Sequence, residues 1–95
     1  MSLKHKKSNI FKKITRYNEF GTLIILYCKN GYTHRNNAPA YVWYHINGNI
    51  AGEYYCANGE YHRVNGPARI CYNEDGTIVS EAYYCQGKEI SHCER

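Results

Sequence analysis

The chain has 95 residues and a formal net charge of +4, and this length is enough for one domain at most. Hydrophobic residues make up 43% of it, which excludes an intrinsically disordered chain, while 2 Pro and 8 Gly exclude a collagen-like or linker sequence. The 11 Tyr dominate an aromatic content of 15%, which favours an all-β protein because tyrosine packs well on half-buried sheet surfaces.

The first 16 residues form a basic leader that contains no acidic residue. It holds 6 of the 12 bases, so residues 17–95 carry the other 6 bases and all 8 acids, a net charge of −2. Such an arm contacts phosphates or an acidic partner, or else is a solvated tail, and a short helix is one conformation open to it. We therefore divide the chain into a leader, 1–16, and a domain, 17–95. The cations of the leader are Lys4, Lys6, Lys7, Lys12, Lys13 and Arg16.

The domain contains three repeat units, at 17–43, 44–71 and 72–95. Each unit begins with a Tyr four residues before a Gly, and these tyrosines (Tyr17, Tyr44, Tyr72) lie 27 and 28 residues apart. Asn-Gly and Asp-Gly pairs within the units favour tight hairpin turns, because these residues tolerate positive φ. The expected strands lie near 13–17, 22–28, 40–44, 49–56, 68–72 and 77–85, with proline-containing loops at 35–39 and 63–67.

A second motif, Tyr-Cys shortly before a turn, closes the long strand of each unit at Tyr27-Cys28, Tyr55-Cys56 and Tyr84-Cys85. Because side chains alternate along a strand, we expect the three cysteines on one face of the sheet and the three tyrosines on the other. Both faces then carry large side chains. The leader, or a second copy in a two-fold homodimer, is therefore expected to cover one of them.

Segment 58–68 reads Asn-Gly-Glu-Tyr-His-Arg-Val-Asn-Gly-Pro-Ala. It resembles the Asn-Gly-x-x-His-Arg-x-x-Gly-Pro-Ala repeats of bacteriophage, giant-virus and bacterial proteins, which are similar to MORN repeats. The resemblance covers about 17–93, with Ala38 in place of the Gly in unit one and a truncated match in unit three. It implies a single-layer antiparallel β-meander of three MORN-like hairpin repeats, and a scaffolding or docking function.

Several residues recur at the same place from unit to unit. An active site needs one arrangement, whereas a structural ladder needs the same residue in every unit, so we expect the recurrent residues to be structural and predict no catalytic residue and no cofactor. Cysteine gaps of 28, 15, 14 and 8 residues do not fit a closed zinc site, and the only cluster to consider is Cys71 with His92 and Cys93. The recurrent residues are His34, Arg35, Pro39, His62, Arg63 and Pro67.

Tyr41 and Trp43 escape this repetition, because the other units place Arg16 and Cys71 at the position of Trp43. Aromatic residues are typical anchors of binding interfaces, so these two and the six cations of the leader are the predicted partner-binding residues. The protein is expected to be a non-enzymatic binder of a host protein or protein–nucleic acid complex. Our most concrete hypothesis is a phage or viral inhibitor of a host defence complex, such as a CRISPR effector.

Other functions stay open at this stage. They are a membrane- or phosphoinositide-associated scaffold that uses the leader, a small nucleic-acid-binding protein, and a small enzyme or zinc protein. The longest apolar run, 23–28, is about a third of what a membrane span needs, so no span is expected. The odd count of 5 Cys without a C-x-x-C motif argues against a disulfide framework and favours the cytoplasm, that of the host if the protein is viral.

Overall fold

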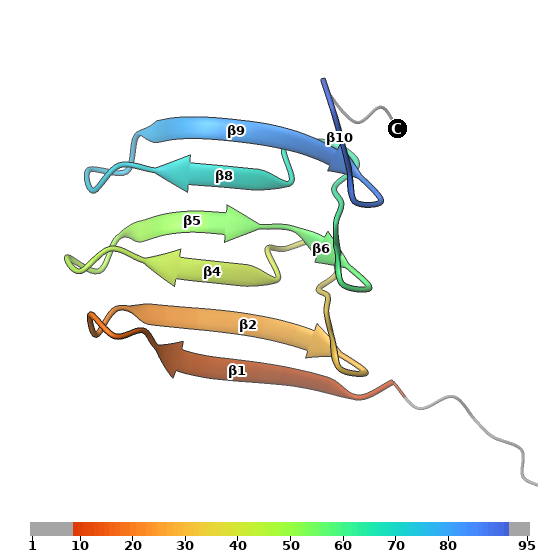
Figure 1. Cartoon of the computed structure of the whole chain (residues 1–95), viewed down its shortest axis with the longest axis horizontal. Helices are drawn as coiled ribbons and strands as arrows, with labels where there is room; N and C mark the ends of the chain where they lie inside the picture. The colour runs from red at the N-terminus through yellow and green to blue at the C-terminus, as the bar shows by residue number, and fades with distance from the viewer. Residues whose placement is uncertain (1–8, 92–95) are drawn as a thin grey trace, which may run out of the picture.

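The computed structural model describes residues 9–91 and, within them, contains ten β-strands and no helix (Figure 1). The predicted all-β antiparallel meander of hairpins is confirmed, and each expected strand lies within two residues of an observed one, except that 49–56 is divided into two. The strands are β1 Phe11–Tyr17, β2 Leu23–Lys29, β3 Tyr32–Thr33, β4 Tyr41–Tyr44, β5 Ile50–Tyr54, β6 Cys56–Ala57, β7 Glu60–Tyr61, β8 Arg69–Tyr72, β9 Ile78–Cys85 and β10 Lys88–Ile90.

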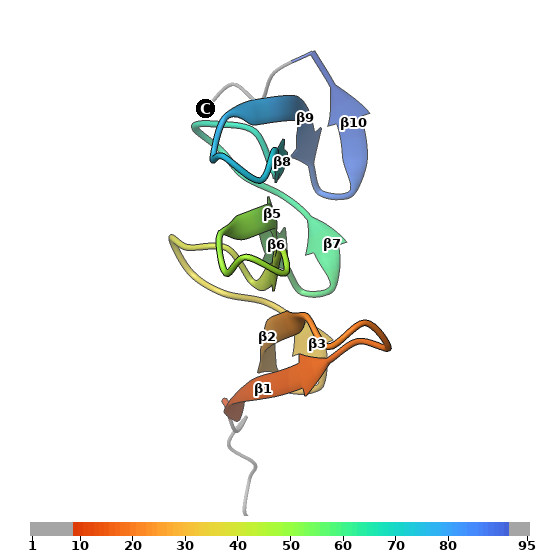
Figure 2. The same cartoon turned by 90° about the vertical axis from the view of Figure 1, so that its left-hand side faces the viewer.

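Three long hairpins, β1–β2, β4–β5 and β8–β9, lie side by side in one sheet with the strand order β1-β2-β4-β5-β8-β9-β10. The strand β3 pairs with β2, and β6 pairs with β7 in a separate two-stranded sheet. Figure 2 shows β3, β7 and β10 arranged along one side of the stack. Each unit is thus a long hairpin followed by a short one.

The short hairpins turn on two residues with positive φ. Asn30 and Asn58 have φ of 50° and 52°, and the glycine after each has φ of 86° and 85°, as a type I′ turn requires. In unit three Gln86 takes the position of the asparagine with φ of 52°. The turn is therefore conserved in geometry although its first residue changes.

The backbone hydrogen bonds reveal a one-residue error in the predicted alignment of unit three. Ala40 donates to the carbonyl of Tyr54, and Ala68 donates to that of Ala82, so Ala82 is equivalent to Tyr54. Counting forward from this pair, Tyr84 is equivalent to Cys56. The Tyr-Cys motif is therefore displaced by one residue in unit three.

This displacement overturns the predicted ladder of three cysteines. Cys28 and Cys56 occupy equivalent places, but Cys85 falls one residue later and its side chain alternates to the opposite face. Tyr84 takes the face predicted for the cysteines. The match of Tyr84 with Tyr27 and Tyr55 is likewise wrong.

A β-bulge explains why the first spacing is 27 residues and the second 28. In the second hairpin, Trp43 is opposite Gly52 and Tyr44 is opposite Ile50, which leaves Ala51 as an extra residue. The third hairpin has the same irregularity at Val79, whereas β1 and β2 pair without a shift. Unit one lacks this one residue.

The core of this sheet is small, and no large side chain in the described residues is fully buried. A single layer leaves most side chains at least partly exposed on one face or the other, as the sequence predicted. The buried apolar residues are Ala40, Val42, Ala51, Cys56, Ala68 and Ile70.

The leader is partly a strand. β1 begins at Phe11, so residues 11–16 belong to the sheet, and the helical conformation considered for the leader is wrong over this range. Residues 1–8, which include Lys4, Lys6 and Lys7, and residues 92–95 lie outside the described residues.

Candidate binding surface

The recurrent arginines stack on tyrosine rings and brace the loops. The guanidinium of Arg63 lies 3.8 Å from the ring centroid of Tyr55 and donates a hydrogen bond of 3.1 Å to the carbonyl of Pro67. Such cation–π stacking combined with a loop hydrogen bond fixes the path of the chain between units. The equivalent contacts in unit one are Arg35 with Tyr27 at 3.7 Å and with Pro39 at 3.3 Å.

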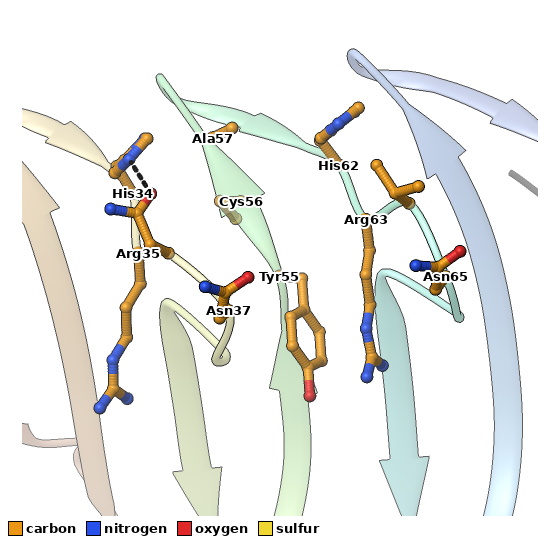
Figure 3. Close-up of a pocket in the computed structure, with 11 residues that line it drawn as sticks. His34, Arg35, Asn37, Tyr55, Cys56, Ala57, His62, Arg63 and Asn65 are labelled. Carbon is orange, nitrogen blue, oxygen red and sulfur yellow. Dashed lines mark hydrogen bonds between the residues drawn. The ribbon is translucent and has the colours of Figure 1, made fainter. Parts of the chain in front are cut away.

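The recurrent histidines join each unit to the next. The Nδ1 atom of His34 accepts the amide of Asn58 at 2.9 Å, so the ring proton is on Nε2, which donates to Asn36 at 3.1 Å. His62 accepts the amide of Gln86 at 2.9 Å in the same way. These histidines lie above a groove of about 550 Å³ between the two loops (Figure 3). Both Nδ1 lone pairs are occupied by backbone amides, which suits a structural joint.

The free thiols give no metal site in the described residues. Cys28, Cys56 and Cys71 are free, Cys85 is disulfide-bonded, and residues 9–91 contain no cluster of three metal-ligating side chains. Burial raises the pKa of Cys56 to about 11, so it stays a neutral thiol near pH 7. His92 and Cys93, which completed the cluster considered from the sequence, lie outside the described part.

Five aromatic side chains form a continuous cluster, which we call the aromatic row. Tyr41 and Trp43 from β4 lead through Tyr54 of β5 to Tyr61 of β7 and Tyr84 of β9, and all five are half-buried. The rings contact one another edge to face or tilted, which is the favourable arrangement for aromatic pairs. The centroid distances are 5.7 Å for Tyr41–Trp43, 5.3 Å for Tyr41–Tyr54, 4.8 Å for Trp43–Tyr54, 5.1 Å for Tyr54–Tyr61 and 5.0 Å for Tyr61–Tyr84.

Trp43 lies flat over Gly52, the residue opposite it on β5. A Cβ atom built at Gly52 would come within 2.0 Å of the indole, far inside van der Waals contact. The glycine therefore makes room for the indole, which reaches Tyr54 beyond it. Gly52 is absent from the sequence-based site, although a glycine inside a strand is the signal of such a close approach.

The guanidinium of Arg69, on β8, lies against two rings of the aromatic row. Its guanidinium lies 4.9 Å from the Tyr54 ring and 5.5 Å from the Tyr61 ring, and donates a hydrogen bond of 3.2 Å to the Tyr54 hydroxyl. Its Nε atom is buried and has no hydrogen-bond partner. Three of the rings also line a hollow of about 630 Å³, with Glu60 at its rim: Tyr41, Tyr54 and Tyr61.

The strand β1 places two leader cations on the face of the aromatic row. Arg16 pairs with Ile24, which pairs with Trp43, and directly paired residues share a face of the sheet. Lys12 precedes Arg16 by four residues, so its side chain lies on the same face of β1. Lys13 points to the other face, where its Nζ lies 6.0 Å from the Tyr27 ring. The structure therefore brings part of the predicted leader site together with Trp43.

No protein-family model, no curated protein and no solved structure matches this chain. The MORN-like resemblance stays a prediction. In residues 9–91 there is no helix, and hence none long and apolar enough to cross a membrane.

Proposed function

We propose that this protein is a non-enzymatic binding module that holds an acidic protein surface against its aromatic row. The observation that supports this most is the convergence of Tyr41 and Trp43, which depart from the repeat, with three further rings into one half-exposed surface. Half-exposed aromatic clusters with a hollow beside them are typical of interface hot spots.

The charges on this face favour an acidic partner. Lys12, Arg16 and Arg69 share it with the aromatic row. Two acidic residues lie beside the row, Glu60 at the hollow and Glu89 opposite Tyr84. Positive charge around an aromatic centre speeds encounter with an acidic surface, and the effect weakens with salt. The rings pack mainly edge to face on one another, which suits a protein contact better than a platform for stacking successive bases.

Affinity capture from a cell lysate tests this proposal with three matched baits. We expect wild type and Phe20→Ala, a change at a 72% exposed turn residue, to retain the same acidic proteins, and Trp43→Ala to lose them. Thermal melting of each bait checks that it is folded. Retention of the same proteins by Trp43→Ala would contradict the proposed contact surface.

Two further probes separate the competing partner classes. A labelled thymidine oligonucleotide and vesicles of anionic lipid report nucleic-acid and membrane binding. If either binds wild type and Trp43→Ala equally and no protein is retained, the nucleic-acid or membrane-scaffold alternative replaces our proposal. Inhibition of a host defence complex, such as a CRISPR effector, is the biological role that we propose for this binding, on the resemblance to phage and viral repeats alone.

A further inference from the structure

The two outer strands of the sheet offer matching edges. Among residues 9–91, β1 pairs only with β2, and the part of β9 that precedes Ala82 pairs only with β8. An unpaired strand edge presents a row of backbone N–H and C=O groups that another chain can pair with. Each edge is therefore able to pair with a strand of another chain.

The two junctions between the units show which strands fit together, because both pair the same three equivalent positions. In each junction a three-residue stretch of one long hairpin pairs with a three-residue stretch of the next. The pairs are Ile24↔Trp43, Ile25↔Val42 and Leu26↔Tyr41 in the first junction, and Gly52↔Cys71, Glu53↔Ile70 and Tyr54↔Arg69 in the second.

One repeat further on, the stretch equivalent to 52–54 is 80–82 on β9. One repeat back, the stretch equivalent to 41–43 and 69–71 is 14–16 on β1. We propose that copies of this protein stack head to tail, with 14–16 of one copy paired antiparallel to 80–82 of the next. The expected pairs are Ser80 with Arg16, Glu81 with Thr15, and Ala82 with Ile14.

A side-chain bond supports the same alignment. In the second junction the hydroxyl of Tyr72 donates a hydrogen bond of 2.6 Å to Glu53. The residue equivalent to Glu53 at the outer edge is Glu81, which is exposed, and the residue equivalent to Tyr72 on β1 is Tyr17, which is 69% exposed. Stacking therefore reproduces this bond between copies, with Tyr17 as donor and Glu81 as acceptor.

The charges of the two edges are complementary. In the proposed pairing Lys13 and Tyr17 lie two residues on either side of Thr15 and on its face, so Glu81 lies between them. Pairing of β1 with a second β1 would instead bring cations together, and pairing of two β9 edges would bring the two Glu81 carboxylates together. Like charges opposite each other destabilise strand pairs, so head-to-tail stacking is favoured over a two-fold edge dimer.

Lys13 also limits the strength of the contact. Its equivalents in the inner units, Ala40 and Ala68, are both 0% exposed, and a lysine at a strand edge resists pairing with most other strands. The contact between copies is not held by a connecting loop as the inner junctions are. We therefore expect reversible growth that increases with concentration.

Light scattering on the full chain, from micromolar to millimolar concentration, measures this growth. We expect the weight-average mass of wild type to rise by at least about twofold over the range, as mass action requires of a reversible stack. Glu81→Lys, and separately the pair Lys13→Glu with Arg16→Glu, should each lower the association constant by roughly tenfold or more. All three residues are exposed, and melting curves check that the variants fold.

Mixing the two variants gives the sharpest test. Where one variant stacks on the other, the altered β9 edge meets the altered β1 edge, or the two unaltered edges meet. Opposite charges face each other in both cases, so growth should return to the level of wild type. Lys29→Glu is the control for a Lys-to-Glu substitution, because it makes the same kind of replacement as Lys13→Glu on β2, inside the sheet, and should leave growth unchanged. A constant monomer mass for wild type, or failure of the mixture to recover growth, would overturn the proposal. Loss of growth in Trp43→Ala with normal growth in Glu81→Lys would overturn it as well, since association would then use the aromatic row.

Discussion

The fit of Trp43 over Gly52 gives the sharpest prediction about the aromatic row. Gly52 does not have a positive φ, so alanine is compatible with its backbone and would ordinarily stabilise a strand by about 0.5–1 kcal/mol. The new methyl group, however, would lie 2.0, 2.3 and 2.5 Å from three atoms of the indole. Ordinary contact needs about 3.4 Å or more, so the indole has to move by over 1 Å.

Moving the indole costs its contacts with the neighbouring rings. Trp43 lies 4.8 Å from Tyr54 and 5.7 Å from Tyr41, and each such aromatic pair contributes about 0.5–1.5 kcal/mol. The loss of both outweighs the backbone gain. Gly52→Ala should therefore lower the free energy of unfolding by about 1–2 kcal/mol.

Denaturant unfolding followed by fluorescence measures this directly, because Trp43 is the only tryptophan of the chain. The emission maximum of folded Gly52→Ala should shift to longer wavelength as the indole becomes more exposed. In a Trp43→Ala background the same Gly52→Ala change should be neutral or stabilising, and tyrosine fluorescence or circular dichroism follows that pair. If Gly52→Ala is destabilising by the same amount in both backgrounds, the contact with the indole is not the cause.

Three further changes test other parts of the structure. Burial, and then its bond with Glu53, raise the pKa of Tyr72 to about 12, so the folded state keeps a proton that the unfolded chain loses near pH 10. The stability that this pair contributes is thus lost between about pH 10 and 12. Tyr72→Phe should lower the free energy of unfolding by about 1 kcal/mol at pH 7. When unfolding is measured at rising pH, the free energy of unfolding of this variant should fall less steeply than that of wild type. Cys56 should react with a thiol reagent more slowly than the less buried Cys71, and equal rates followed by mass spectrometry would contradict its burial. His34→Ala should lower the free energy of unfolding by about 1–2 kcal/mol in thermal melts, because it leaves a backbone amide without its acceptor; an unchanged melting temperature would argue against that role.

The sequence predicted the hairpins well because turn chemistry is local. Asn30 and Asn58 adopt the positive φ that their Asn-Gly pairs favour, and the strands on either side follow from the turn. The alignment of unit three went wrong for the same local reason. The segment Tyr83-Tyr84-Cys85 contains two adjacent tyrosines, and either could be matched with Tyr55. Only the position of the turn at Gln86 shows that Tyr83 is the equivalent residue.

The aromatic row could be predicted only in part, because its assembly depends on non-local pairing. The unusual position of Trp43 was visible as a break in the repeat. Which rings it meets depends on the bulge at Ala51, since one extra residue exchanges the two faces of a strand. The insertion of Arg69 depends on the pairing of β5 with β8. Neither the bulge nor this pairing can be predicted from the local sequence.

In a single-layer repeat protein, residues that recur in every unit and residues that occur in one unit point to different roles. Arg35 and Arg63 make the same contacts in successive units, and contacts of that kind hold the stack together at every level. A partner that binds at one place has to recognise what is not repeated, and Trp43 over Gly52 occurs in one unit of the described chain. A second copy, by contrast, has to recognise what is repeated, and the edge around Glu81 preserves the pattern of the junction below it. The two proposals thus use opposite properties of one sheet, and this is why Trp43→Ala and Glu81→Lys should separate them.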